Sequence, residues 1–169
     1  MQTVNSREAS DAIEIRSALE GFAARLAAQR GIASAQTALL RQYVASMEKI
    51  AVAYGSLSTD MLTQYAKLNA SFHAMLFELA QCPALNRQLA GEFLGSLALI
   101  DVRAVVKAGS ELRSFMLFEQ DQHRSLMDAI IQGDGPQAES LAREHGRLSQ
   151  KYLVSLETAT RQRTPSEAL

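Results

Sequence analysis

Apolar residues recur at spacings of three and four along almost the whole chain, and this period constrains the fold more than any other feature. A clear example is the run Leu39, Leu40, Tyr43, Val44 and Met47. Such spacing predicts amphipathic helices with one apolar stripe each. No segment shows the period-two alternation of a half-buried strand. Many of the apolar residues are Ala, Leu and Met, which are good helix formers. The sequence therefore predicts an all-α protein.

Turn signals divide the 169 residues into six predicted helices. Gly, Pro and capping residues interrupt the apolar period between them. The helices are expected over residues 10–30, 35–54, 60–80, 84–107, 111–132 and 135–160. Long helices joined by short turns predict an antiparallel bundle. Residues 1–9 are expected to be a linker or disordered start, residues 10–160 a single bundle domain and residues 161–169 a polar tail.

Charge and cysteine content exclude several classes of protein. Lys and Arg total 17 against 18 Asp and Glu, a net charge of -1, so the basic excess of a nucleic-acid surface is missing. The single cysteine, Cys82, excludes an internal disulfide and a Cys-only zinc site. No apolar run approaches the roughly 20 residues of a membrane span, and the first residues do not resemble a signal peptide. We therefore expect a cytoplasmic protein that does not bind DNA or a membrane by itself.

Three histidines, His73, His123 and His145, lie on three different predicted helices. Each shares the apolar stripe of its helix, so all three are expected to face the core, and Asn69 lies one turn before His73 on the same face. A lone core histidine is more often a structural group with a neighbouring hydrogen-bond partner. Three that converge on one point make a metal site as good an interpretation as a structural one, because imidazole ligates Zn, Ni, Cu and Fe and the Asn69 oxygen offers a fourth donor.

Other residues offer partial alternatives to this site. The chain has no HExxH, paired ExxH or CxxC motif and no Gly-rich phosphate loop. Glu119 shares the stripe of His123 and is a candidate general base or a partner that orients a ligand. Arg16, one turn before Glu20, and Arg103, which lies among apolar residues, are either surface cations or buried cations for a ligand carboxylate.

Four stretches occur in an order and spacing that resemble one family. They are "EIRSALEGFAARLAA", "NASFHAMLFELAQCPAL", "EQDQHRSLMDAIIQGD" and "AESLAREHGRLS". Together they are similar to the effector-binding C-terminal domain, or FCD domain, of GntR-type bacterial transcription regulators of the FadR subgroup. The resemblance covers about residues 10–155.

This resemblance implies a bundle of six to seven helices that encloses a cavity for a small carboxylate. In many members an Asp and three His bind a divalent metal at the floor of that cavity. Carried over to this chain, the metal ligands are Asn69, His73, His123 and His145. Asn69 stands where the family usually has Asp, and a neutral amide oxygen attracts a dication less strongly than a carboxylate does.

The resemblance also implies a function, that of a ligand-sensing and dimerisation domain rather than an enzyme. A small organic acid would bind beside the metal, and the candidate effector-binding residues are Arg16, Arg103, Glu20 and Glu119. The domain would form a homodimer, with exposed apolar residues of the first and fourth predicted helices at the interface. DNA would be bound only through an N-terminal winged helix-turn-helix domain that family members carry and this chain lacks, which favours a fragment of a longer regulator.

Two alternatives remain open at this point. The same three histidines would suit a metal-dependent helical-bundle enzyme in which a metal-bound water is the nucleophile. A metal-free structural dimer would bury them without any ligand.

Overall fold

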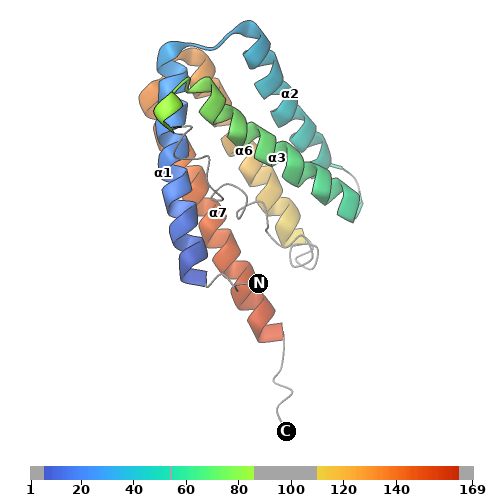
Figure 1. Cartoon of the computed structure of the whole chain (residues 1–169). Coiled ribbons are helices and arrows are strands. Elements are labelled where there is room, and N and C mark those ends of the chain that lie inside the picture. Colours follow the sequence, from blue (N-terminus) through green and yellow to red (C-terminus); the bar gives the residue numbers. More distant parts are fainter. Residues whose placement is uncertain (1–5, 54, 86–109, 164–169) are drawn as a thin grey trace.

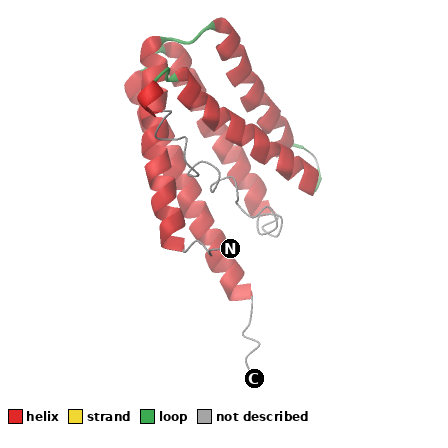
Figure 2. Cartoon of the chain, viewed as in Figure 1, coloured by secondary structure: helices red, strands yellow, loops and turns green. Residues whose placement is uncertain are grey.

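The described part of the chain is built from α-helices joined by short turns (Figures 1 and 2). The computed structural model describes residues 6–53, 55–85 and 110–163. Its helices are α1 (Ser6–Arg30), α2 (Ser34–Ala51), α3 (Thr59–Leu79), α6 (Ser110–Gln132) and α7 (Gly135–Arg163). Residues 83–85 are also helical, and the rest of the predicted fourth helix lies outside the described residues. Within the described ranges there is no strand, and the all-α prediction is confirmed.

Most predicted helix ends lie close to the observed ones, and the first is the main exception. α1 begins at Ser6 rather than near residue 10, so residues 6–9 belong to the first helix, while the division of the chain into linker, domain and tail stays a prediction. These residues include the helix formers Arg7, Glu8 and Ala9, which favour extension of the helix. They carry no apolar stripe, so the apolar period could not predict that they are helical. α7 likewise runs to Arg163, three residues into the predicted tail.

Side-chain caps fix two of the helix starts. The Ser58 side chain accepts a hydrogen bond from the Met61 backbone N–H at 3.2 Å, at the start of α3. Asp134 accepts one from the Gln137 N–H at 3.0 Å, at the start of α7. Each cap pairs a backbone N–H that has no partner within the helix.

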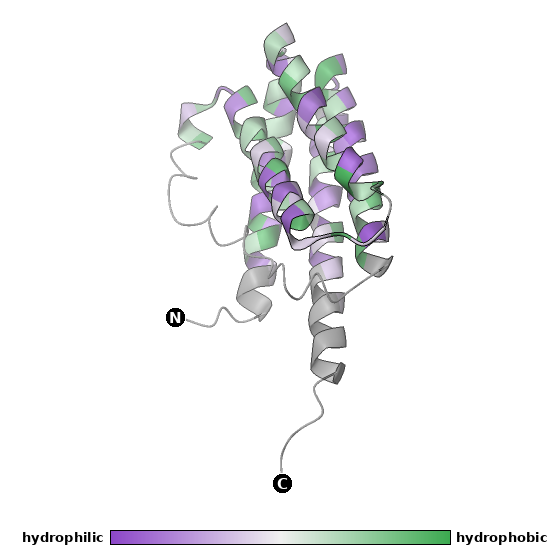
Figure 3. Cartoon of the chain, turned by 90° about the vertical axis from the view of Figure 1, so that its right-hand side faces the viewer, coloured by the Kyte–Doolittle hydropathy of each residue, from purple (hydrophilic) through white to green (hydrophobic). Residues whose placement is uncertain are grey.

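The helices pack as a bundle in which the directly connected pairs α1 and α2, α2 and α3, and α6 and α7 run in opposite directions (Figure 1). α1 lies along α7 in the most extensive of the described helix contacts, α2 lies along α3, and α6 contacts both α7 and α2. Polar and apolar residues alternate around each helix in Figure 3, as expected for amphipathic helices. The fully buried core includes Leu40, Met47, Phe72, Leu76 and Leu126. The antiparallel bundle is thus the observed fold, and none of the described helices is long and apolar enough to cross a membrane.

Two arginines tie helix ends that are distant in sequence. The Arg30 guanidinium, at the end of α1, donates to the carbonyls of Ala80 and Gln81 at the end of α3. Arg113 of α6 donates to three backbone carbonyls in and after the last turn of α2, at 2.6 to 2.7 Å. Carbonyls at a helix C-terminus have no partner within the helix, so these contacts both satisfy them and hold the bundle together.

Candidate metal centre

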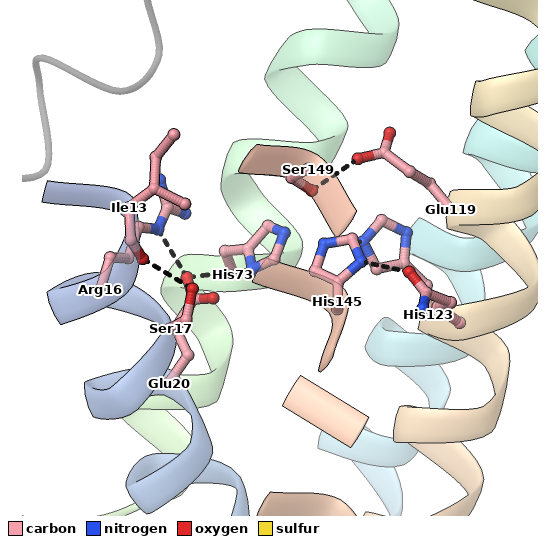
Figure 4. Close-up of polar contacts among 10 residues, drawn as sticks. Ile13, Arg16, Ser17, Glu20, His73, Glu119, His123, His145 and Ser149 are labelled. Carbon is pink, nitrogen blue, oxygen red and sulfur yellow. Dashed lines mark hydrogen bonds and ion pairs between the residues drawn. The ribbon is translucent and has the colours of Figure 1, made fainter. Parts of the chain in front are cut away.

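The three histidines meet in the interior, where α3, α6 and α7 approach one another (Figure 4). The exposed fractions of His73, His123 and His145 are 4%, 0% and 4%. One ring nitrogen from each lies within 4.8 Å of the others, and the Nε2 atoms of His123 and His145 are 3.3 Å apart. The prediction that all three face inward and converge is therefore confirmed.

Ring contacts fix the orientation of these side chains. The His73 and His145 rings stack with centroids 5.2 Å apart, and the His123 ring lies 4.5 Å from that of His145. Phe72, one residue before His73, packs on the His123 ring with centroids 4.6 Å apart. The residue before His73 thus supplies an aromatic ring that packs against His123.

Glu20 of α1 lies behind His73 and is itself buried. Its Oε1 lies 3.0 Å from His73 Nδ1, at ion-pair distance, although the two atoms are not aligned for a hydrogen bond. The same oxygen accepts a hydrogen bond from Arg16 Nε at 2.7 Å. Burial would raise the pKa of Glu20, but the charges of His73 and Arg16 outweigh it and lower the pKa to about 2. Glu20 therefore remains ionised, and Arg16 reaches the centre through this carboxylate.

Two glutamines of α6 contact the other two histidines. Gln122 Oε1 lies 3.1 Å from His145 Nδ1, and Gln120 Nε2 lies 3.3 Å from His123 Nδ1. Partners at Nδ1 set the orientation and tautomer of an imidazole and thereby leave Nε2 for other contacts. The sequence analysis missed both glutamines, although Gln120 lies three residues before His123 and so on the same side of the helix.

Burial keeps two of the imidazoles neutral. It lowers the pKa of His145 to about 3, assisted by the charges of His73 and Arg16 and opposed by that of Glu20. Burial and the two neighbouring imidazoles hold the pKa of His123 well below its ordinary value. Neutral imidazole is the form that ligates a metal, so the site needs no deprotonation of these rings at neutral pH.

Asn69 lies one turn before His73 on α3, as the sequence predicts. Its side-chain oxygen, Oδ1, is buried and has no hydrogen-bond partner among the described residues. An unpaired buried polar atom costs about 1–3 kcal/mol, so such an oxygen commonly marks the place of a ligand or ion. The unpaired oxygen of Asn69 therefore makes this residue a candidate donor beside the three clustered imidazoles.

Glu119 lies one turn before His123 but belongs to a separate polar cluster. Tyr65 OH and Ser149 Oγ each donate to its carboxylate at 3.2 Å. Burial raises the pKa of Glu119 to about 7, and the two hydrogen bonds only partly oppose it. None of the described ion pairs includes Glu119. The sequence analysis did not identify Tyr65 or Ser149 as partners of Glu119. Arg103, the remaining candidate effector-binding residue, lies outside the described residues.

Comparison with known families identifies the chain. A family model described as the FCD domain matches residues 11–148. The chain belongs to the FCD domain family. An FCD domain is the C-terminal, effector-binding domain of GntR-family transcription regulators, so the resemblance drawn from the four sequence stretches is confirmed at this level. The FadR subgroup stays a prediction. A search of curated proteins found no match to this FCD domain.

Proposed function

We propose that this FCD domain senses a small organic acid that binds beside a divalent metal. The metal would be held by His73, His123, His145 and Asn69 Oδ1. The observation that carries the proposal is the convergence of three buried ring nitrogens from three helices within 4.8 Å. The orphaned Asn69 oxygen and the neutral state of His123 and His145 support the same donor set.

The residues around the histidines have distinct roles in this proposal. Glu20 would orient His73 and Gln122 would orient His145, each through the Nδ1 atom of the ring. A bound metal supplies a Lewis acid that attracts the carboxylate or hydroxyl of the effector. Arg16, which is largely buried and already paired with Glu20, offers a guanidinium for a second carboxylate contact.

Ligand binding would be transmitted through a homodimer of the domain. An effector can change DNA affinity only if it binds one arrangement of the dimer better than the other, with coupling of about 1–3 kcal/mol. DNA recognition is assigned to a different domain of the regulator, because a net charge of -1 gives this domain no basic excess.

Metal content together with a ligand screen tests the proposal directly. Protein purified without chelator is expected to carry about one Zn²⁺ or Ni²⁺ per chain by elemental analysis, and His145→Ala should abolish it. Cys82→Ser, which removes the one cysteine, serves as the control and should keep the metal. Small carboxylates should raise the melting temperature of the metal-loaded protein and not of the chelated protein. Absence of metal in the purified and the zinc-soaked protein would refute the metal centre. Metal without any carboxylate response would refute the sensing role.

Asn69→Asp offers a graded test of the fourth ligand. A carboxylate attracts a dication more strongly than an amide does, so zinc affinity should rise about tenfold or more by calorimetric titration. Asn69→Ala, which removes the oxygen, should lower the affinity. Equal affinities in all three proteins would show that residue 69 is not a ligand.

A further inference from the structure

Gln120 connects the histidine centre to the polar cluster around Glu119. The Gln120 side chain is only 1% exposed. Its Nε2 lies 2.6 Å from Tyr65 OH, 3.3 Å from His123 Nδ1 and 3.9 Å from Met47 Sδ. Its other end, Oε1, is buried without a hydrogen-bond partner among the described residues. The nitrogen thus faces every polar neighbour, and the oxygen faces none.

This orientation of the amide determines the tautomer of His123. An N–H of Gln120 donates to His123 Nδ1, so that nitrogen carries no hydrogen and the ring hydrogen lies on Nε2. His123 Nε2–H then donates to His145 Nε2 at 3.3 Å, and His145 Nδ1–H donates to Gln122 Oε1 at 3.1 Å. Every donor in this series of hydrogen bonds, from Gln120 to Gln122, meets an acceptor, so the assigned tautomers are mutually consistent.

The same tautomer is incompatible with ligation through His123 Nε2. A ligating nitrogen offers its lone pair, so the hydrogen of the neutral ring must lie on Nδ1. Nδ1–H then needs an acceptor, and Gln120 can provide one only by turning Oε1 toward it. In the orientation described, the buried Oε1 is the end of the amide without a partner, so turning the amide gives this oxygen a donor.

We propose that Gln120 is a positioning residue whose amide has two orientations, set by whether His123 Nε2 ligates a metal. With the centre empty, the amide nitrogen donates to His123 Nδ1. With the centre loaded, the amide oxygen accepts from Nδ1–H. The inference rests on the proposed metal centre and adds to it a part of the chain that responds to metal occupancy.

Turning the Gln120 amide also changes the hydrogen bonds of Tyr65 on α3. In the orientation described, Tyr65 OH accepts from Gln120 and donates to Glu119 Oε2 at 3.2 Å. When Gln120 presents its oxygen, Tyr65 OH donates to that oxygen instead and releases the Glu119 carboxylate. Glu119 also accepts from Ser149 of α7, so the change in hydrogen bonding reaches α3, α6 and α7.

The tautomer of His123 in the unmodified protein provides the first test. Long-range ¹H–¹⁵N NMR spectra at neutral pH should show the His123 hydrogen on Nε2 in the metal-free protein and on Nδ1 after addition of Zn²⁺. Hydrogen on Nδ1 in both states, with zinc bound, overturns the role of Gln120 and leaves the metal centre intact. Failure to bind zinc overturns the metal centre and, with it, the response to occupancy.

Two isosteric charge variants separate hydrogen bonding from electrostatics. The ionised carboxylate of Gln120→Glu can only accept, so at a pH where it is ionised this variant should place the His123 hydrogen on Nδ1 in the metal-free protein and raise zinc affinity. Gln122→Glu adds the same charge beside His145, where an oxygen already faces Nδ1, and should leave the His123 tautomer unchanged. A His123 tautomer that is the same in both variants would overturn the inference.

Gln120→Met tests the loss of the hydrogen-bond acceptor for His123 Nδ1–H. It keeps the approximate size of the side chain but removes the acceptor, so zinc affinity should fall about tenfold, as is typical when a partner of a ligating imidazole is lost. Unchanged affinity would contradict the inference. If either Gln120 variant fails to fold, the spectra of the unmodified protein still decide the question.

Discussion

At the scale of single residues, Glu20 and Glu119 show how neighbours decide the charge of a buried carboxyl. Both are nearly inaccessible to solvent. Glu20 has Arg16 and His73 beside it, and its pKa falls to about 2 despite burial. Glu119 has only the hydroxyl groups of Tyr65 and Ser149, so burial dominates and raises its pKa to about 7. The first carboxylate orients a histidine, whereas the second can exist as a neutral acid near pH 7.

The raised pKa of Glu119 predicts a pH-dependent effect of Glu119→Gln on stability. The folded-state pKa of about 7 lies above the ordinary value of 4.5, so the stability contributed by protonated Glu119 is complete below pH 4.5 and is lost as pH rises through 7. The amide does not titrate. Compared with the native protein, Glu119→Gln should therefore gain up to about 3 kcal/mol in free energy of unfolding between acidic and mildly basic pH.

Urea denaturation of the chelated proteins at acidic and mildly basic pH measures this gap. Glu78→Gln, at an exposed position of α3, is the matched control. Its difference from the native protein in free energy of unfolding should not change with pH, whereas that of Glu119→Gln should. A stability difference between Glu119→Gln and the native protein that stays constant with pH would contradict the assignment.

At the scale of helices, the crossing of α1 and α7 brings Glu20 and His145 into one site. Their backbones approach closely where Gly146, the residue after His145, faces Ser17 of α1. A Cβ atom built at Gly146 would overlap Oγ and Cβ of Ser17. The glycine is therefore required by the approach of the two helices, even though glycine disfavours a helix interior.

Gly146→Ala is predicted to destabilise the fold. Alanine gains about 1 kcal/mol in helix propensity, but the overlap with Ser17 must separate the helices, at a typical cost of about 1–3 kcal/mol. We expect a net loss in free energy of unfolding and weaker zinc binding, because α7 carries His145. Adding Ser17→Gly should restore stability by making room on α1. A single variant as stable as the native protein by urea denaturation would show that this contact is loose.

At the scale of the whole molecule, the candidate metal centre lies where four helices meet. α3, α6 and α7 supply the histidines, and α1 supplies Glu20. A ligand shared by three helices stabilises only the folded state, because the unfolded chain does not hold these residues together. Metal binding should therefore act on global stability as well as on effector binding.

Zinc is predicted to raise the melting temperature of the domain, and chelation to reverse the rise. At a free concentration of 100 times Kd the stabilisation is about 2.7 kcal/mol, which corresponds to roughly 5–10 °C for a domain of this size. Differential scanning calorimetry with and without zinc and chelator measures it. His123→Ala should show no shift. An equal shift in that variant would place zinc elsewhere on the protein.

The sequence by itself determined the helical class, most helix ends and the three inward histidines with Asn69. These follow from local physics, since the apolar period sets which face of a helix is buried. Helix ends without an apolar stripe, such as residues 6–9, escaped this signal. Tertiary structure alone decided that Glu20 and Gln122 face His73 and His145 and that Tyr65 and Ser149 surround Glu119. The reason is that these partners come mostly from helices distant in sequence, and their contacts depend on how the helices cross rather than on any local spacing.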